Sequence, residues 1–163
     1  MNRFLILLVA FFTCFNAVPC TSAIVSGRFT VNGRPILWKH RDTSDLNNKV
    51  ERIESESGFD YLALFNQSDT LREQAWIGFN EVGFAIMNTA SYNLKADSVK
   101  EMDKEGLVMA KALETCRTVD DFESFLNREQ KPLGVEANFG VIDANGSAAY
   151  FETCNFDFKR IDV

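Results

Sequence analysis

Histidine is almost absent from this sequence of 163 residues, because His40 is the only one. A protease that pairs cysteine with histidine would have to use His40, and a zinc site built from several histidines is excluded. The chain also lacks the CxxC, HExxH and GxSxG motifs and any glycine-rich phosphate-binding loop. These absences count against zinc peptidases, serine hydrolases and phosphate-loop enzymes.

Positive charge is scarce as well. The chain has 17 Lys and Arg residues against 23 Asp and Glu residues, which gives a formal net charge of −6 at pH 7. No basic stretch with interleaved aromatic residues occurs. We therefore expect no nucleic-acid partner.

The sequence has one long hydrophobic run, at its start. Arg3 precedes an apolar stretch from Phe4 to Phe15. A bilayer-spanning helix needs about 20 apolar residues, and a positive charge before a shorter run is typical of a secretory signal peptide. We expect a leader at residues 1–19, one domain at residues 20–163, export to the periplasm or outside the cell, and no membrane span.

Cys20 lies where this leader ends. Pro19 is a poor residue at a signal-peptidase site, so two routes stay open: cleavage directly before Cys20, and cleavage upstream, after Ala17, followed by trimming or self-cleavage of the remnant. Lipid attachment to Cys20 is a third alternative, although Val18 and Pro19 do not supply the small residue usually found before a lipidated cysteine. The first two routes leave Cys20 with a free α-amine.

Of the four cysteines, Cys14 leaves with the leader. The odd number that remains predicts at least one free thiol. We expect Cys116 and Cys154 to be small buried hydrophobic residues. An N-terminal Cys20 would combine a nucleophile with a base, because its α-amine has an ordinary pKa of about 7.7 to 8.0 and accepts the thiol proton near neutral pH.

Residue periodicity predicts strands on both sides of a helical region. Apolar residues spaced by 3.6 predict a helix at 99–116, and Thr118 with Asp121 predicts the cap of a second helix. This order predicts an α+β fold with helices on a sheet face. The expected strands are 20–26, 35–39, 50–54, 61–65, 75–79, 84–88, 137–143, 147–152 and 156–163.

Three motifs carry a family resemblance. They are Cys20-Thr21-Ser22, Lys39-His40-Arg41-Asp42, and Gly78-Phe79-Asn80-Glu81-Val82-Gly83-Phe84-Ala85-Ile86-Met87-Asn88. With them the chain resembles the linear-amide C–N hydrolases of the N-terminal nucleophile (Ntn) class, which include choloylglycine (bile salt) hydrolases and penicillin V acylases. It is most similar to the acyl-CoA:6-aminopenicillanate acyltransferase-like peptidases.

The resemblance implies an Ntn-hydrolase αββα sandwich that needs no metal and no organic cofactor. In that family a further asparagine and an arginine complete the site well downstream, and no matching segment occurs before Val163. We therefore expect the chain to be the N-terminal part of the sandwich, C-terminally incomplete, with apolar sheet surface left exposed.

The resemblance also implies roles for single residues. Cys20 would be the nucleophile, Asp42 would hold its α-amino group, and Asn88 would donate an amide N–H to the oxyanion. The spacing from Gly83 to Asn88 is shorter than in bile salt hydrolases, so Asn93 or a backbone N–H is an alternative donor.

The substrate-binding candidates surround these residues. Lys39 stands where the family has an arginine, and Arg41 lies close by in the sequence. Trp38, Phe79 and Tyr92 are candidate walls of an apolar acyl site, with a place in the core as the alternative.

The expected function is an exported amidohydrolase that cleaves a linear, non-peptide amide of a small molecule through a thioester on Cys20. Hydrolysis and transfer of the acyl group to an amine both stay open, as does a homo-oligomer. One alternative is a secreted or lipid-anchored binding protein with Cys20 as the anchor. The other is an inactive truncated fragment of the enzyme.

Overall fold

The computed structural model describes residues 20–91, 97–100 and 102–163. Within these residues the fold consists of two sheets, two α-helices and the short 3-10 helix η2 (Gly27–Phe29), which confirms the predicted α+β class. The strands are β1 (Thr21–Val25), β2 (Ile36–His40), β3 (Asn48–Ile53), β4 (Tyr61–Asn66), β5 (Ile77–Asn80), β6 (Ala85–Ala90), β7 (Ala137–Ile142), β8 (Ala148–Thr153) and β9 (Phe158–Asp162), and the helices are α2 (Glu105–Thr115) and α3 (Val119–Arg128).

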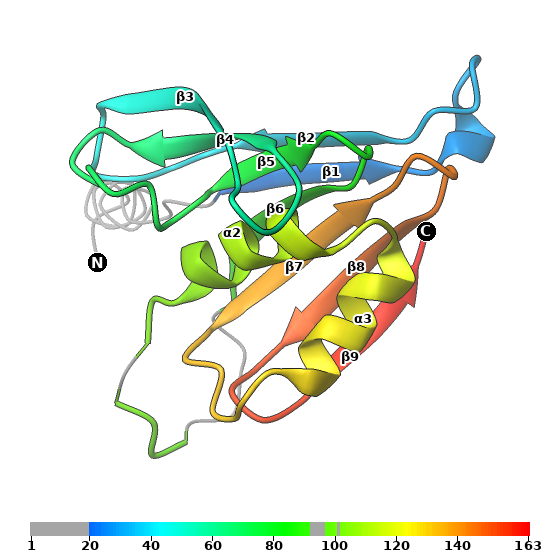
Figure 1. Cartoon of the computed structure of the whole chain (residues 1–163). Helices are drawn as coiled ribbons and strands as arrows, with labels where there is room; N and C mark the ends of the chain where they lie inside the picture. The colour runs from blue at the N-terminus through cyan, green and yellow to red at the C-terminus, as the bar shows by residue number, and fades with distance from the viewer. Residues whose placement is uncertain (1–19, 92–96, 101) are drawn as a thin grey trace, which may run out of the picture.

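The elements form three layers. β3 to β9 make one antiparallel sheet of seven strands in sequence order, and β1 pairs with β2 in a separate two-stranded sheet. The helices α2 and α3 cover one face of the large sheet, and the β1–β2 hairpin packs against β6, β7 and β8 on the other (Figure 1). Gly140 of β7 allows the hairpin to approach the large sheet closely, because a Cβ at this position would lie only 2.8 Å from Ile24 Cδ1 of β1.

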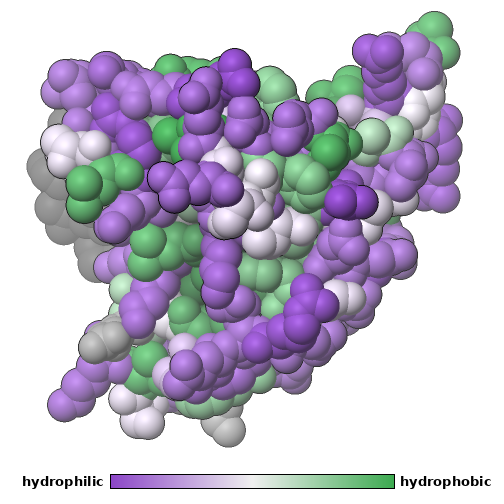
Figure 2. Space-filling view, viewed as in Figure 1, coloured by the Kyte–Doolittle hydropathy of each residue, from purple (hydrophilic) through white to green (hydrophobic). Residues whose placement is uncertain are grey.

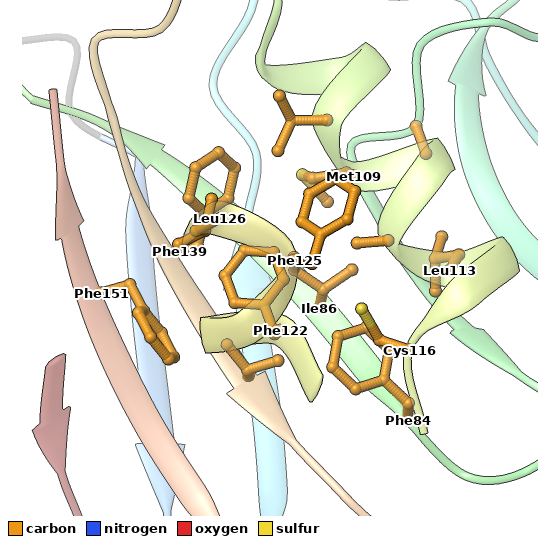
Figure 3. Close-up of a cluster of buried hydrophobic side chains, with 14 of the residues drawn as sticks. Phe84, Ile86, Met109, Leu113, Cys116, Phe122, Phe125, Leu126, Phe139 and Phe151 are labelled. Carbon is orange, nitrogen blue, oxygen red and sulfur yellow. The ribbon is translucent and has the colours of Figure 1, made fainter. Parts of the chain in front are cut away.

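An aromatic cluster fills the space between the helices and the large sheet. Phe122 of α3 is fully buried, and its ring centroid lies 5.0 Å from that of Phe151 and 5.7 Å from that of Phe139, both with edge contacts. Figure 3 shows these rings gathered under α3. Edge-to-face packing matches the positive edge of one ring to the negative face of the next, so the cluster fixes α3 on the sheet.

The two remaining cysteines differ in their surroundings. Cys116 is buried in the core, and burial raises the pKa of its thiol to about 12, so it stays protonated at neutral pH. Cys154 was expected to be buried too, but it lies half-exposed in the turn between β8 and β9, with its Sγ 3.3 Å from Asp157 O. That turn is a bend and not part of a strand, which is why the apolar pattern around it was misleading.

The first helix starts later than predicted. α2 begins at Glu105 and not at residue 99, because Asp103 has a φ of 66°, in the left-handed region that an α-helix cannot contain. The second helix matches its prediction, since the Thr118 side chain accepts from Asp121 N and Asp121 in turn accepts from the Thr118 backbone. This capping box fixes where α3 starts.

Among the described residues, none forms a full second layer over the β4–β5 part of the large sheet. A groove of about 730 Å³ runs over β4 and β5, and Phe79 beside it is 54% exposed. This is the apolar surface that an incomplete sandwich predicts. The loop between β1 and β2 also projects from the body of the protein, and its tip is hydrophobic (Figure 2), where Phe29 and Val31 are exposed.

Candidate active site

A pocket of about 330 Å³ opens where the N-terminal end of β1 and the C-terminal end of β2 meet β6, β7 and the start of α2. This is the lower end of the ~300–1,000 Å³ range of small-molecule sites. Cationic and acidic side chains both reach it. Its lining is Cys20, Lys39, Arg41, Asp42, Thr43, Trp76, Asn88, Ala90, Ser91, Met102, Asp103, Glu105, Glu136 and Ala137.

Cys20 is placed by the pairing of β1 with β2. Thr21 pairs with His40, so Cys20 comes to lie beside the residues that follow β2. Its half-buried Sγ is 3.7 Å from the backbone oxygen of Asp42. The thiol therefore opens into the pocket next to the motif at residues 39–42.

Lys39 faces the pocket because side chains alternate along β2. Lys39 points toward the large sheet, whereas its neighbours Trp38 and His40 are exposed on the outer face. Its Nζ donates to Asn88 Oδ1 at 2.6 Å and to the backbone oxygen of Trp76 at 2.9 Å. Burial lowers the pKa of Lys39 from its usual 10.5 to about 8, against the opposing effect of Cys20.

The hydrogen bond from Lys39 fixes the orientation of the Asn88 amide. Asn88 lies on β6 opposite Phe139 and is 7% exposed. An ammonium group has no acceptor, so the atom that faces Lys39 must be Oδ1, and the donor Nδ2 is turned away from it. Among the described residues Nδ2 has no hydrogen-bond partner, which leaves an amide donor available at the pocket wall.

Arg41 and Trp76 form a stacked pair at the same wall. The guanidinium carbon of Arg41 lies 4.6 Å from the centroid of the Trp76 ring, and Nη1 donates to Asn48 Oδ1. Burial is the main cause that lowers the pKa of Arg41, which still remains charged at neutral pH. The sequence prediction missed Trp76, whose only signal was its aromatic side chain within the strand expected at 75–79; β5 itself begins at Ile77.

Acidic residues line the pocket near α2. Glu105 is the first residue of that helix and is 8% exposed, and its Oε1 accepts from the backbone N–H of Glu136 at 2.9 Å. Burial is the largest cause that raises the pKa of Glu105, and the charges of Asp103 and Glu136 add to it. The sequence prediction missed these residues, which are brought to the pocket only by tertiary packing.

The structure brings together Cys20, Lys39, Arg41, Asp42 and Asn88 as lining residues of one pocket. Asp42, an exposed residue of the pocket lining, contacts Cys20 through its backbone oxygen.

The aromatic candidates lie elsewhere. Trp38 is 50% exposed on the outer face of β2, and Phe79 lines the groove over β4 and β5. Tyr92 and Asn93 lie outside the described residues. The described apolar contribution to the pocket wall comes instead from residues such as Trp76 and Met102.

Residues 20–91, 97–100 and 102–163 contain no group of three or more His, Cys, Asp or Glu side chains arranged to hold a metal ion. No helix within the same residues is long and apolar enough to cross a membrane.

No protein-family model matches the chain, and no curated protein matches it. Solved structures do match. A variant of the conjugated bile acid hydrolase of Clostridium perfringens superposes with a TM-score of 0.64 at 12% identity, over 89% of this chain and 51% of that one. A second variant of the same hydrolase gives a TM-score of 0.55 at 12% identity, over 72% of this chain and 44% of that one.

The fold is that of the N-terminal nucleophile hydrolases. The chain spans about half the length of both hydrolase structures, as expected of the N-terminal part of an αββα sandwich. In this Ntn-hydrolase fold, α2, α3 and the large sheet supply one helix layer and one sheet layer, and β1 and β2 belong to the second sheet. The penicillin V acylase of Agrobacterium tumefaciens also matches, with a TM-score of 0.46 at 15% identity, over 88% of this chain and 40% of that one.

Proposed function

We propose that the chain is the N-terminal part of an exported amidohydrolase that cleaves a linear, non-peptide amide through Cys20. The observation that carries the proposal is the arrangement of one pocket, in which a free thiol lies with the Lys39 ammonium and the Asn88 amide. The Ntn-hydrolase fold supports the same class of chemistry. Removal of residues 1–19 exposes the α-amine that the mechanism needs.

The first step forms a thioester. The α-amine of the mature Cys20 takes the thiol proton, and the thiolate attacks the amide carbonyl carbon to form a C–S bond. The α-ammonium then gives this proton to the leaving nitrogen as the C–N bond breaks. Water, or an amine acceptor in the case of acyl transfer, attacks the thioester and returns the thiol.

Asn88 is the proposed oxyanion donor. Its Nδ2 is held ready by the bond from Lys39 to Oδ1, so no reorganisation is needed when the carbonyl oxygen becomes negative. One such donor contributes about 2.7 to 4 kcal/mol to stabilisation of the transition state. Asp42 has the proposed role of holding the α-ammonium of Cys20 in place.

Lys39 and Arg41 are the proposed cations of the site. Burial lowers the pKa values of both, and the negative charge of the nearby Cys20 opposes that effect in each. Both also line the pocket and are proposed to contact the polar part of the substrate. Arg41 remains positive over the whole working range of pH, whereas Lys39 does not.

The test compares full-length protein with its Cys20→Ala and Cys20→Ser variants. Amine release from a panel of N-acyl amides, which includes conjugated bile acids and penicillin V, should fall by at least about a thousandfold in both variants. N-terminal mass analysis of the exported protein should give a mature chain that begins at unmodified Cys20. Undiminished turnover in Cys20→Ala, or acyl chains on the Cys20 amine, would contradict the proposal.

A further inference from the structure

The pocket is electrically divided. Lys39 and Arg41 lie beside Cys20, whereas Glu105 and Glu136 line the part formed by the start of α2 and β7. In the described part of the chain, no lysine, arginine or histidine forms an ion pair with either glutamate or with Asp103. The N-terminus of α2 favours the negative charge of Glu105, and a carboxylate without a protein counter-ion at a pocket wall can take its counter-ion from a ligand.

The structural role of Glu105 uses only part of its carboxylate. Oε1 accepts from the backbone N–H of Glu136 and so ties the start of α2 to the start of β7. The carboxylate also interacts with the backbone N–H of Glu105 itself. Within residues 20–91, 97–100 and 102–163, no other residue donates to Oε2, and Glu105, which is 8% exposed as a residue, lines the pocket. A neutral glutamine would make the same tie, so this tie does not explain the negative charge.

A carboxylate oxygen that no other residue pairs, at a pocket wall, is suited to one kind of ligand group. A protonated amine brings both the positive charge and the additional N–H donors that Oε2 lacks. The pocket of about 330 Å³ is lined by both Glu105 and Cys20, so one small molecule reaches both.

We propose that the amide substrate carries an ammonium group, and that Glu105 binds this group while the amide carbonyl lies at Cys20. This inference rests on the proposed amidohydrolase function and names the substrate class within it. Asp103 and Glu136 are exposed and add negative potential at the pocket without direct contact. Glu105 is then the residue that selects cationic over neutral amides.

The test uses matched amides that differ in one group. N-(4-aminobutyl)phenylacetamide is compared with N-pentylphenylacetamide, in which methyl replaces the ammonium on the amine side. The pentylamides of 4-(aminomethyl)phenylacetic acid and 4-ethylphenylacetic acid make the same comparison on the acyl side. The full-length mature protein is assayed beside Glu105→Gln, which keeps the acceptor for Glu136 N–H, and beside Glu73→Gln, which removes an exposed charge outside the pocket.

In at least one pair, the protein with Glu105 should favour the ammonium substrate by at least about tenfold in kcat/KM. Glu105→Gln should abolish this preference by lowering kcat/KM for the ammonium substrate much more than for the neutral one, and Glu73→Gln should leave the preference intact. Equal kcat/KM within both pairs, or an equal loss for cationic and neutral substrates in Glu105→Gln, would overturn the inference and leave the amidohydrolase proposal standing.

Binding to Cys20→Ala separates the two proposals. This variant cannot form the thioester, so calorimetry measures the affinity of the intact amides. Tighter binding of an ammonium amide that is lost in the double variant Cys20→Ala/Glu105→Gln supports the inference even if no amide is hydrolysed. Equal affinity for the cationic and neutral members of both pairs overturns it.

Discussion

Replacing Lys39 with methionine should make the stability of the protein less dependent on alkaline pH. Methionine has nearly the same length and volume as the lysine stem but no charge. In the native chain the ammonium lies in a largely buried position between Asn88 Oδ1 and the backbone oxygen of Trp76. Removing it deletes both the cost of burying a charge and the two hydrogen bonds.

The magnitude follows from the pKa of Lys39. Folding lowers this pKa from 10.5 to about 8. Between these pH values the unfolded chain holds a proton that the folded chain has released, so the free energy of unfolding rises with pH. Each pKa unit corresponds to ~1.36 kcal/mol, so the native protein should gain up to about 3 kcal/mol relative to Lys39→Met between pH 7 and pH 10.5.

The assay is urea unfolding of the two proteins at pH 7, 9 and 10.5, read as the difference in free energy of unfolding at each pH. Groups common to both proteins cancel in this difference. The loss of the Lys39 hydrogen bonds also contributes to this difference in free energy. The decisive quantity is therefore how the difference changes with pH, and not its value at any single pH. A difference that stays constant within about 0.5 kcal/mol over this range would refute the reasoning.

A second comparison uses Cys20→Ala as background. The thiolate of Cys20 raises the pKa of Lys39, so its removal should lower that pKa further. The stability difference between Cys20→Ala and the double variant Cys20→Ala/Lys39→Met should then begin to change at lower pH than the same difference with Cys20 present. An unchanged midpoint would show that the two groups do not interact.

Three other outcomes are expected. Asn88→Ala should lower kcat by about a hundredfold to a thousandfold with a smaller change in KM, and equal activity in steady-state assays would remove Asn88 from the oxyanion role. Phe122→Ala should reduce the free energy of unfolding in urea by about 3 to 5 kcal/mol, because removal of this ring leaves a cavity in a fully buried cluster. A loss below about 1 kcal/mol would contradict this packing. Thr118→Ala should lower the free energy of unfolding in urea by about 1 kcal/mol, because it removes the cap of α3. Thr115→Ala is the control outside the cap, and an equal loss of stability in both variants would argue against the capping box.

Local rules recovered much of the fold. Alternation predicted the strand positions, because a half-buried strand must place successive side chains on opposite faces. Thr118 and Asp121 predicted the start of α3, because a capping box needs only residues three apart. The later start of α2 was missed, because the left-handed conformation of Asp103 carries no clear sequence signal.

The site was predicted only where its residues lie in short motifs. The sequence identified Cys20 and residues 39–42, and the pairing of β1 with β2 brings them together. Trp38 was a candidate wall of the acyl site, with the core as the alternative, because period-two alternation says that Trp38 and Lys39 face opposite sides but not which side is covered by the pocket. Both faces of β2 carry apolar residues, and only the packing against the large sheet turns Lys39 inward.

By itself, the sequence determined the α+β class and the candidate nucleophile, and it left His40 as the one histidine that a histidine-based mechanism could use. Tertiary structure alone decided the bond between Lys39 and Asn88, which are 49 residues apart, and the arrival of Trp76 and Glu105 at the same pocket. The physical reason is that local patterns encode which residues an element buries. The partner across a layer is chosen by strand order, register and close approach, such as that at Gly140, and these depend on the whole chain.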